Sequence, residues 1–122
     1  MAFENSLALR VVRRHRDGVT VDCPIREDYM NSQGVLHGGL IASVADEAAW
    51  HALIHTYKGR RNCTTTELKV NYLRPIVGSK VVARAYVLRA GKLLCVSRVD
   101  LFDPQKRLSA VGLVTYMLLP DK

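Results

Sequence analysis

The chain has 122 residues and a mass of 13.6 kDa, which is the size of one domain. Hydrophobic residues make up 48% and charged residues 24%, which excludes an intrinsically disordered chain, and no apolar run approaches the length of a transmembrane helix. Eighteen Lys and Arg against 11 Asp and Glu give a net charge of +7, which favours anionic partners. These basic residues are scattered and not interleaved with aromatics, so we expect neither nucleic acid nor membrane as partner. The first residues lack a signal-peptide pattern, which predicts a cytoplasmic chain.

Two short strands are predicted first. Residues 7–16 alternate imperfectly between apolar and basic side chains, Asp17-Gly18 is a turn signal, and residues 19–25 form a second strand. Pro24 restricts that second strand to a sheet edge or places its end there. The following polar segment, from residue 26 to Gly39, is typical of a loop.

The hydrophobic period changes to that of a helix from Leu40 to about Tyr57, and Gly59 is expected to end this helix. Its apolar positions recur at steps of three and four, and many of them are alanines. A narrow apolar helix of this kind can lie close against a sheet that wraps around it. The recurring positions are Ile41, Val44, Ala45, Ala48, Ala52 and Leu53.

Four long strands are predicted after the helix, at residues 64–72, 80–89, 93–102 and 108–119. Strict alternation in the first of them places Thr64, Thr66, Leu68, Val70 and Tyr72 on one face and Thr65 on the other. The sequence therefore predicts a single α+β domain over residues 1–122, with an antiparallel sheet and one central helix. One helix covers only one sheet face, so the other face is either solvated or used for assembly, and the apolar last two strands favour assembly.

Three cysteines, Cys23, Cys63 and Cys95, lie far apart, and their odd number favours reduced thiols, with Cys95 in the core. Glu47, His51 and His55 are spaced by four on one helical stripe and could form a metal site. The alternative is a polar helix face near the negative end of the helix dipole. Because no further ligand is suggested nearby, we expect no metal.

Two features of the helical region indicate chemistry. Gly38 and Gly39 lie where the loop becomes helix, and backbone N–H groups there lack intrahelical partners and can stabilise an oxyanion. The alternative is that the two glycines only form a tight helix entry. Asp46 lies two turns into an alanine-rich helix, where a carboxylate is costly unless it is paired, functional or on the solvated side.

The motif H-G-G six residues after Asn31, V-A-D in the helix, and the run T-T-E-L-K-V-N-Y-L-R-P from Thr65 resemble the hotdog-fold thioesterases of the phenylacetate-pathway (PaaI-like) type. The resemblance covers about residues 17–116. It implies a sheet wrapped around the central helix, a homodimer that joins two sheets, and often a dimer of dimers. The implied activity is hydrolysis of an acyl-CoA thioester. The alternatives are a hydratase or dehydratase on the same fold, and a non-catalytic acyl-CoA-binding module.

The resemblance also implies residue roles. Gly38 matches the glycine whose N–H polarises the thioester carbonyl, and Asp46 matches the carboxylate that acts as general base or nucleophile. Asn31 matches the amide that holds the water or the thioester, and His37 supports the same loop. Thr65 matches the residue that hydrogen-bonds near the carboxylate, although a shift to Thr64 or Thr66 is open. In the family, Asn and HGG come from one subunit and Asp and Ser/Thr from the other.

Substrate contacts are predicted on the same basis. Gly39 completes the oxyanion turn, and Trp50 is expected either to narrow the acyl pocket or to fill the interface. No separate cofactor is expected, since coenzyme A is part of the substrate. Its phosphates need basic groups at the pocket mouth, and each candidate is alternatively a surface charge. The candidates are Arg74, Arg89, Lys92, Lys106 and Arg107.

Overall fold

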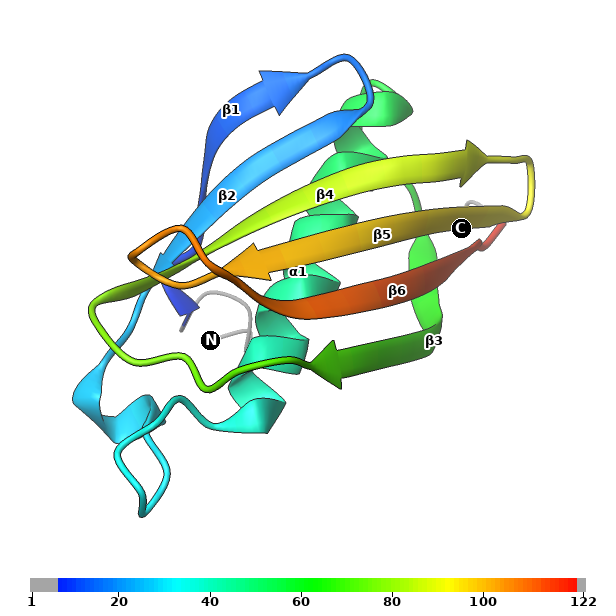
Figure 1. Cartoon of the computed structure of the whole chain (residues 1–122). Coiled ribbons are helices and arrows are strands. Elements are labelled where there is room, and N and C mark those ends of the chain that lie inside the picture. The colour runs from blue at the N-terminus through cyan, green and yellow to red at the C-terminus, as the bar shows by residue number, and fades with distance from the viewer. Residues whose placement is uncertain (1–6, 121–122) are drawn as a thin grey trace.

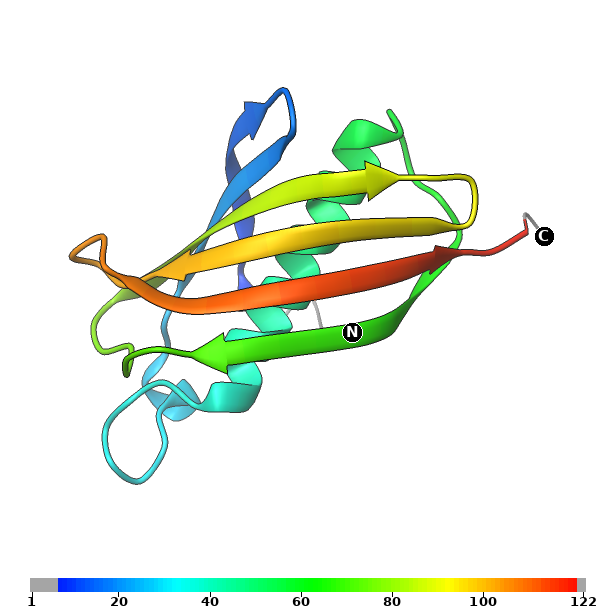
Figure 2. The same ribbon diagram turned by 45° about the vertical axis from the view of Figure 1, so that its right-hand side comes forward.

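The structure, a computed structural model, describes residues 7–120. Six strands form one antiparallel sheet in the order β1-β2-β4-β5-β6-β3 (Figure 1). Helix α1, Gly38–Thr56, lies across one face of this sheet (Figure 2), and a short 3-10 helix spans Glu27–Tyr29. The predicted α+β architecture is confirmed. The strands are β1 Arg10–His15, β2 Gly18–Pro24, β3 Cys63–Tyr72, β4 Lys80–Ala90, β5 Leu94–Phe102 and β6 Leu108–Leu118.

The core lies between α1 and the sheet, and small residues bring the two layers close together. The helix packs on β2, β4, β5, β6 and β3, and its alanines on that side are at most 2% exposed. On β6, Gly112 has no side chain, and a Cβ there would lie 3.6 Å from the Cβ of Ala45. Larger apolar side chains fill the space on either side of the alanines. The fully buried ones include Val19, Val21, Val44, Leu53, Val81, Val99, Leu101 and Val114.

Two element boundaries differ from the prediction for local reasons. Strand β1 starts at Arg10 because Ala8 adopts φ 52°, a left-handed conformation that does not belong to an extended strand. Helix α1 starts at Gly38 rather than Leu40 because His37 caps it. The Nδ1 atom of His37 accepts a hydrogen bond of 3.0 Å from the Gly39 N–H.

The predicted alternation along β3 is wrong at its start. The ladder between β3 and β6 shifts register between Thr65 and Glu67, so Thr66 is an extra residue that has no partner in the ladder. A bulge of one residue reverses the alternation beyond it. Thr65 therefore faces α1, on the same side of the sheet as Val70 and Tyr72, instead of opposite them.

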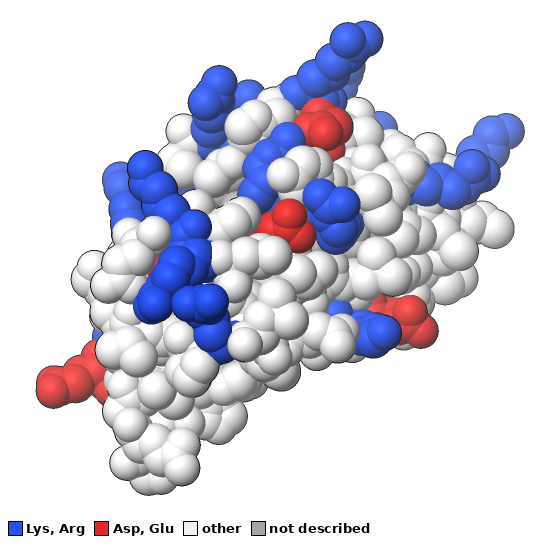
Figure 3. All heavy atoms as spheres, viewed as in Figure 1, with Lys and Arg blue, Asp and Glu red and all other residues white. Residues whose placement is uncertain are grey.

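The outer face of the sheet, away from α1, carries separate charged side chains within a larger uncharged area (Figure 3). Figure 3 shows Lys and Arg side chains spread across it, with fewer Asp and Glu between them. Among the described residues, strand β3 pairs with β6 alone and forms one edge of the sheet. No helix within residues 7–120 combines the length and the apolarity that crossing a bilayer requires.

All three cysteines are free thiols. Cys95 is 1% exposed, which confirms its predicted place in the core, and Cys23 is equally buried. The Cys23 S–H donates to the Leu7 carbonyl oxygen at 2.9 Å, and burial raises the pKa of this thiol to about 11. Both buried thiols are therefore protonated near neutral pH and act as small core side chains.

The buried alanines of α1 pack closely on the sheet, so a larger side chain at one of these positions should destabilise the fold. Ala48 is completely buried between α1 and the sheet. An Ala48→Leu substitution should lower the free energy of unfolding by about 1–3 kcal/mol, because the added methyl groups force the helix away from the strands. Denaturant unfolding measures this change. The same substitution at the exposed Ala90 is the control, and equal effects at the two positions would contradict the packing argument.

Candidate active site

Asp46 is half-buried on α1 and receives two hydroxyl hydrogen bonds from the sheet. The Thr65 hydroxyl donates to its Oδ1 at 2.9 Å, and the Tyr116 phenol donates to the same oxygen at 2.8 Å. Thr65 and Tyr116 are direct cross-strand partners on β3 and β6. The phenol also lies 3.1 Å from the main-chain oxygen of Asp46. This carboxylate is therefore paired, which accounts for its presence among alanines.

Tyr116 was not predicted from the sequence as a site residue. The available signal is the alternation in residues 108–119, which places Ala110, Val114 and Tyr116 on the buried face, where a phenol needs a hydrogen-bond partner. That the partner is Asp46 follows only from the packing of α1 on β6. Burial raises the pKa of Tyr116 far above its usual range, and the negative charge of Asp46 raises it further. The phenol is therefore a permanent donor.

The start of α1 presents one backbone donor. The Gly39 N–H is bound by His37, and the Leu40 and Ile41 N–H groups both donate to the main-chain oxygen of His37. Within residues 7–120, the Gly38 N–H has no acceptor, and it lies at the positive end of the helix dipole. This group can donate to a ligand oxygen that acquires negative charge.

The end of β3 is tied to the start of the helix. The Tyr72 hydroxyl donates to the main-chain oxygen of Gly38 at 2.7 Å. A Cβ on Gly38 would lie 3.5 Å from the Tyr72 ring, so the helix start and the strand end are in van der Waals contact. Strand β3 thus contacts both halves of the site, through Tyr72 at one end and Thr65 at the other.

Asn31 organises the loop that leads into the helix. Its side-chain oxygen accepts hydrogen bonds from the N–H groups of Gln33, at 2.9 Å, and Val35, at 3.3 Å. Its own N–H donates to the Val35 carbonyl at 2.8 Å, which closes the turn. The Asn31 side-chain NH₂ has no acceptor among residues 7–120 and can bind a ligand.

The two halves of the site are separate within one chain. Gly38 and Asp46 are eight residues apart on one helix, which is about 12 Å along its axis. Gly38 lies in a groove of about 280 Å³ with Leu36, Tyr72 and Arg74. A different cavity, of about 560 Å³, lies beside Tyr116, which contacts Asp46. Its lining is Ala8, Leu9, Glu47, Trp50, His51, Arg60 and Tyr116.

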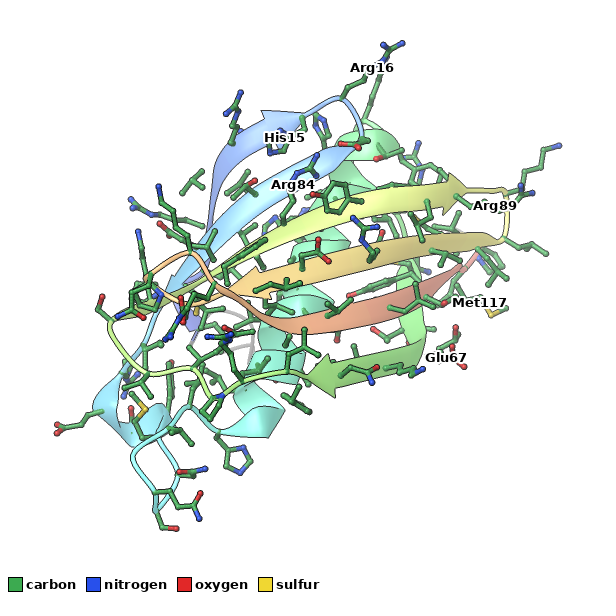
Figure 4. The ribbon with its side chains drawn as sticks, viewed as in Figure 1. His15, Arg16, Glu67, Arg84, Arg89 and Met117 are labelled. Carbon is green, nitrogen blue, oxygen red and sulfur yellow. The ribbon has the colours of Figure 1, made fainter. Side chains whose placement is uncertain are left out.

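The predicted basic contacts divide between two ends of the molecule. Arg74 shares the groove of Gly38. Arg89 and Lys92 instead line a groove with Tyr57, which follows the other end of α1, and Figure 4 shows Arg89 at the end of β4 beside the turn into β5. Of the remaining candidates, Arg107 is paired with the Asp103 carboxylate at 2.7 Å.

Other predicted residues have local partners. The Arg60 guanidinium lies 5.4 Å from the centre of the Trp50 ring, so both side chains form one wall of the 560 Å³ cavity. The His55 Nε2 atom is 2.8 Å from the main-chain oxygen of His15. Burial lowers the pKa of His51, and nearby arginines lower it further. Within residues 7–120, no cluster of three or more His, Cys, Asp or Glu is arranged to hold a metal ion.

A family profile and two relatives that match this chain all carry the name thioesterase. The profile of the thioesterase superfamily matches residues 33–110. Medium/long-chain acyl-CoA thioesterase YigI of Escherichia coli is 35% identical over 100 residues, which cover 71% of this chain and 64% of YigI. Human acyl-coenzyme A thioesterase 13 is 33% identical over 84 residues, which cover 68% of this chain and 59% of that protein. The chain thus spans about three fifths of the length of these two relatives.

Solved structures confirm the predicted hotdog fold. The E. coli PaaI protein from the phenylacetic acid degradation operon superposes with a TM-score of 0.85, over 97% of this chain and 84% of PaaI. Its sequence identity is 18%, so the likeness concerns the fold.

The buried Tyr116 phenol makes the stability of the fold depend on pH in the alkaline range. The folded protein holds the phenolic proton more tightly than the unfolded chain, where the pKa is about 10. The free energy of unfolding should therefore fall as the pH rises above about 10, by up to about 1.4 kcal/mol per pH unit for this group. Urea unfolding between about pH 8 and pH 11 should show a smaller fall for Tyr116→Phe. Equal slopes for the two proteins would contradict the assignment.

Proposed function

Because the chain belongs to the thioesterase superfamily, we propose that it hydrolyses a thioester of coenzyme A to a free acid and CoA. The observation that carries the proposal is the Asp46 carboxylate, fixed by two hydroxyl groups in an otherwise apolar helix face. The acyl-CoA thioesterase names of two relatives support the substrate class. A thioester is already an activated acyl compound, so one positioned carboxylate and one oxyanion donor suffice for its hydrolysis.

In the proposed reaction, the Gly38 N–H donates to the thioester carbonyl oxygen, which becomes negatively charged. Asp46 either takes a proton from the attacking water or attacks the carbonyl carbon itself to form an anhydride that water then opens. In both routes the C–S bond breaks, the thiolate of CoA leaves and is protonated, and the acid is released. Asn31 holds the water or the thioester through its NH₂ group. This chemistry requires no separate cofactor.

One chain cannot supply both groups to the same carbonyl. An oxygen within hydrogen-bond distance of the Gly38 N–H is far from Asp46, since these residues are about 12 Å apart along α1. We therefore propose that each site combines Gly38 and Asn31 of one subunit with Asp46 and Thr65 of a second copy. The same arrangement is known for the PaaI-like family that the sequence resembles.

The free edge of β3 supports such a dimer. Two β3 strands that pair antiparallel about a two-fold axis near the middle of the strand, in such a register, would set the Thr65 end of one strand beside the Tyr72 end of its partner. Since Tyr72 contacts Gly38 and Thr65 contacts Asp46, this register brings the two half-sites together twice. Leu68 and Tyr72 are 38% and 52% exposed in one chain, which is the surface that such pairing would cover. A dimer of dimers would extend the same assembly.

The grooves suggest how the substrate lies. We propose that the acyl group enters the cavity beside Tyr116, with Trp50 as its wall, because Tyr116 lines this cavity and contacts the Asp46 carboxylate. Arg74 lies in the groove of Gly38 and is the favoured contact for the CoA phosphates. Arg89 and Lys92 lie at the other end of α1 and could serve only a site that a second subunit brings to them. The net charge of +7 favours an anionic substrate of this kind.

Removal of the carboxylate should abolish turnover while the fold remains. Asp46→Asn should lower kcat by about a hundredfold or more, because an amide cannot accept the proton from water or form the anhydride. Release of free thiol from a panel of aryl-CoA and alkyl-CoA esters is the measurement.

The matched control is Asp100→Asn on β5, where the carboxylate is paired with Arg98 at 3.4 Å and does not contact the site. This variant should retain the wild-type rate. A folded Asp46→Asn protein with wild-type turnover would exclude Asp46 from the reaction and, with it, the proposed mechanism.

The shared site can be tested by subunit exchange. Asn31→Ala and Asp46→Ala should each be inactive, but a mixed dimer has one site with both lesions and one intact site. If the two variants are unfolded and refolded together in equal amounts, about half of the dimers are mixed, so about a quarter of the wild-type sites should return. No recovery despite confirmed exchange would mean that the two half-sites do not combine across subunits.

A further inference from the structure

The Tyr116 phenol contacts the reacting group of the proposed site. It is 6% exposed, on the inner face of β6, and its oxygen lies 2.8 Å from Oδ1 of Asp46. The main-chain oxygen of Asp46 is a second, longer contact at 3.1 Å. An O–H has one proton to donate, and the shorter bond to an ionised acceptor is the stronger one. The phenol thus binds mainly to the side chain of Asp46.

Both donors reach the same carboxylate oxygen. Thr65 and Tyr116 lie opposite each other in the β3–β6 ladder, and each donates to Oδ1. Among residues 7–120, no donor contacts Oδ2 of Asp46. Two donors on Oδ1 restrict the rotation of the Asp46 carboxylate. Its second oxygen, Oδ2, remains available to accept a hydrogen bond from a ligand.

We propose, on the premise of the function above, that Tyr116 is a positioning residue that acts with Thr65 to hold Asp46 by Oδ1, and that Oδ2 is the reacting oxygen. In the general-base route Oδ2 takes the proton from water. In the nucleophilic route Oδ2 forms the bond to the carbonyl carbon. Tyr116 itself exchanges no proton with the substrate.

The position of the bulge supports this role. The register shift in β3 comes directly after Thr65, so the pair Thr65–Tyr116 is the last regular rung on that side of the bulge. If Thr66 were a regular strand residue and not a bulge, the alternation that directs Tyr72 towards Gly38 would direct Thr65 away from the helix. The bulge therefore allows β3 to serve the helix start and the carboxylate together.

Tyr116→Phe tests the proposal. This variant keeps the ring in the core and removes one donor to Oδ1. We expect kcat for thiol release to fall by about ten- to a hundredfold with little change in KM, because the carboxylate is less well oriented while the substrate surface is unchanged.

Tyr57→Phe is the matched control. The Tyr57 hydroxyl donates to the Gly91 carbonyl at 2.6 Å, far from Asp46, so its removal also costs one partly buried hydrogen bond. This variant should lose stability but keep its kcat. If Tyr116→Phe loses stability and keeps the wild-type kcat, Tyr116 is only structural and the proposal is overturned.

Variants of Thr65 test the shared oxygen. Thr65→Ser keeps a hydroxyl and should keep most of the activity, whereas Thr65→Val should behave like Tyr116→Phe. Because the two donors hold one atom, the effects in the double variant Thr65→Val with Tyr116→Phe should not be additive. Additive effects would show that the two residues act separately and would contradict a joint hold on Oδ1.

Two further outcomes are distinguishable. If Tyr116→Phe does not fold, 3-fluorotyrosine at position 116 keeps the hydroxyl and changes only its acidity. The kcat must then change relative to the same replacement at position 57, and an unchanged kcat overturns the proposal. If the wild-type protein releases no thiol from any ester, the proposed function is wrong and this inference falls with it. An active wild type with an equally active, folded Tyr116→Phe overturns this inference alone.

Discussion

The site depends on bringing a charged carboxylate close to a sheet without leaving it unpaired. The hydrogen bonds to Asp46 are 2.8 and 2.9 Å long, so the backbone of α1 must lie very near β3 and β6. Alanines along the helix and Gly112 on β6 permit that approach. The same small residues that close the core therefore also set the geometry of the Asp46 carboxylate, and the cost of an unpaired charge explains why both hydroxyls are present.

At the start of α1, one residue likewise satisfies most of the polar backbone groups. His37 uses its ring and its carbonyl to satisfy three N–H groups of the first turn. One amide, that of Gly38, is left for a ligand. A single backbone donor would make a modest oxyanion site, which suits the thioester of the proposed reaction, because its carbonyl needs less stabilisation than that of an amide. The arrangement of the loop around Asn31 brings a second polar group to the same end of the helix.

Much of this fold follows from local patterns. The helical period in residues 40–57 and the alternation in the strands predict the elements, because burial on one face imposes those periods. Asp46 could be found because a carboxylate conflicts with its apolar surroundings. The assignment to Thr65 rather than Thr66 could not be decided, since a bulge has no distinct mark in three consecutive threonines. Tyr116 is distant in sequence, and its partner is fixed by tertiary packing. Arg74 and Arg89 looked equivalent because sequence does not tell which strand ends lie near which end of the helix.

The position of both half-sites on one helix has a mechanical consequence. Each α1 of the proposed dimer would supply its first turn to one site and its middle to the other. A helix is stiff along its axis, so a displacement of one α1 by a fraction of a turn would carry Gly38 and Asp46 together. It would misalign the donor in one site and the carboxylate in its twin at once. The two sites would therefore be mechanically coupled through the helices. Binding of substrate in one site would change the geometry of the other without any change in the sheet.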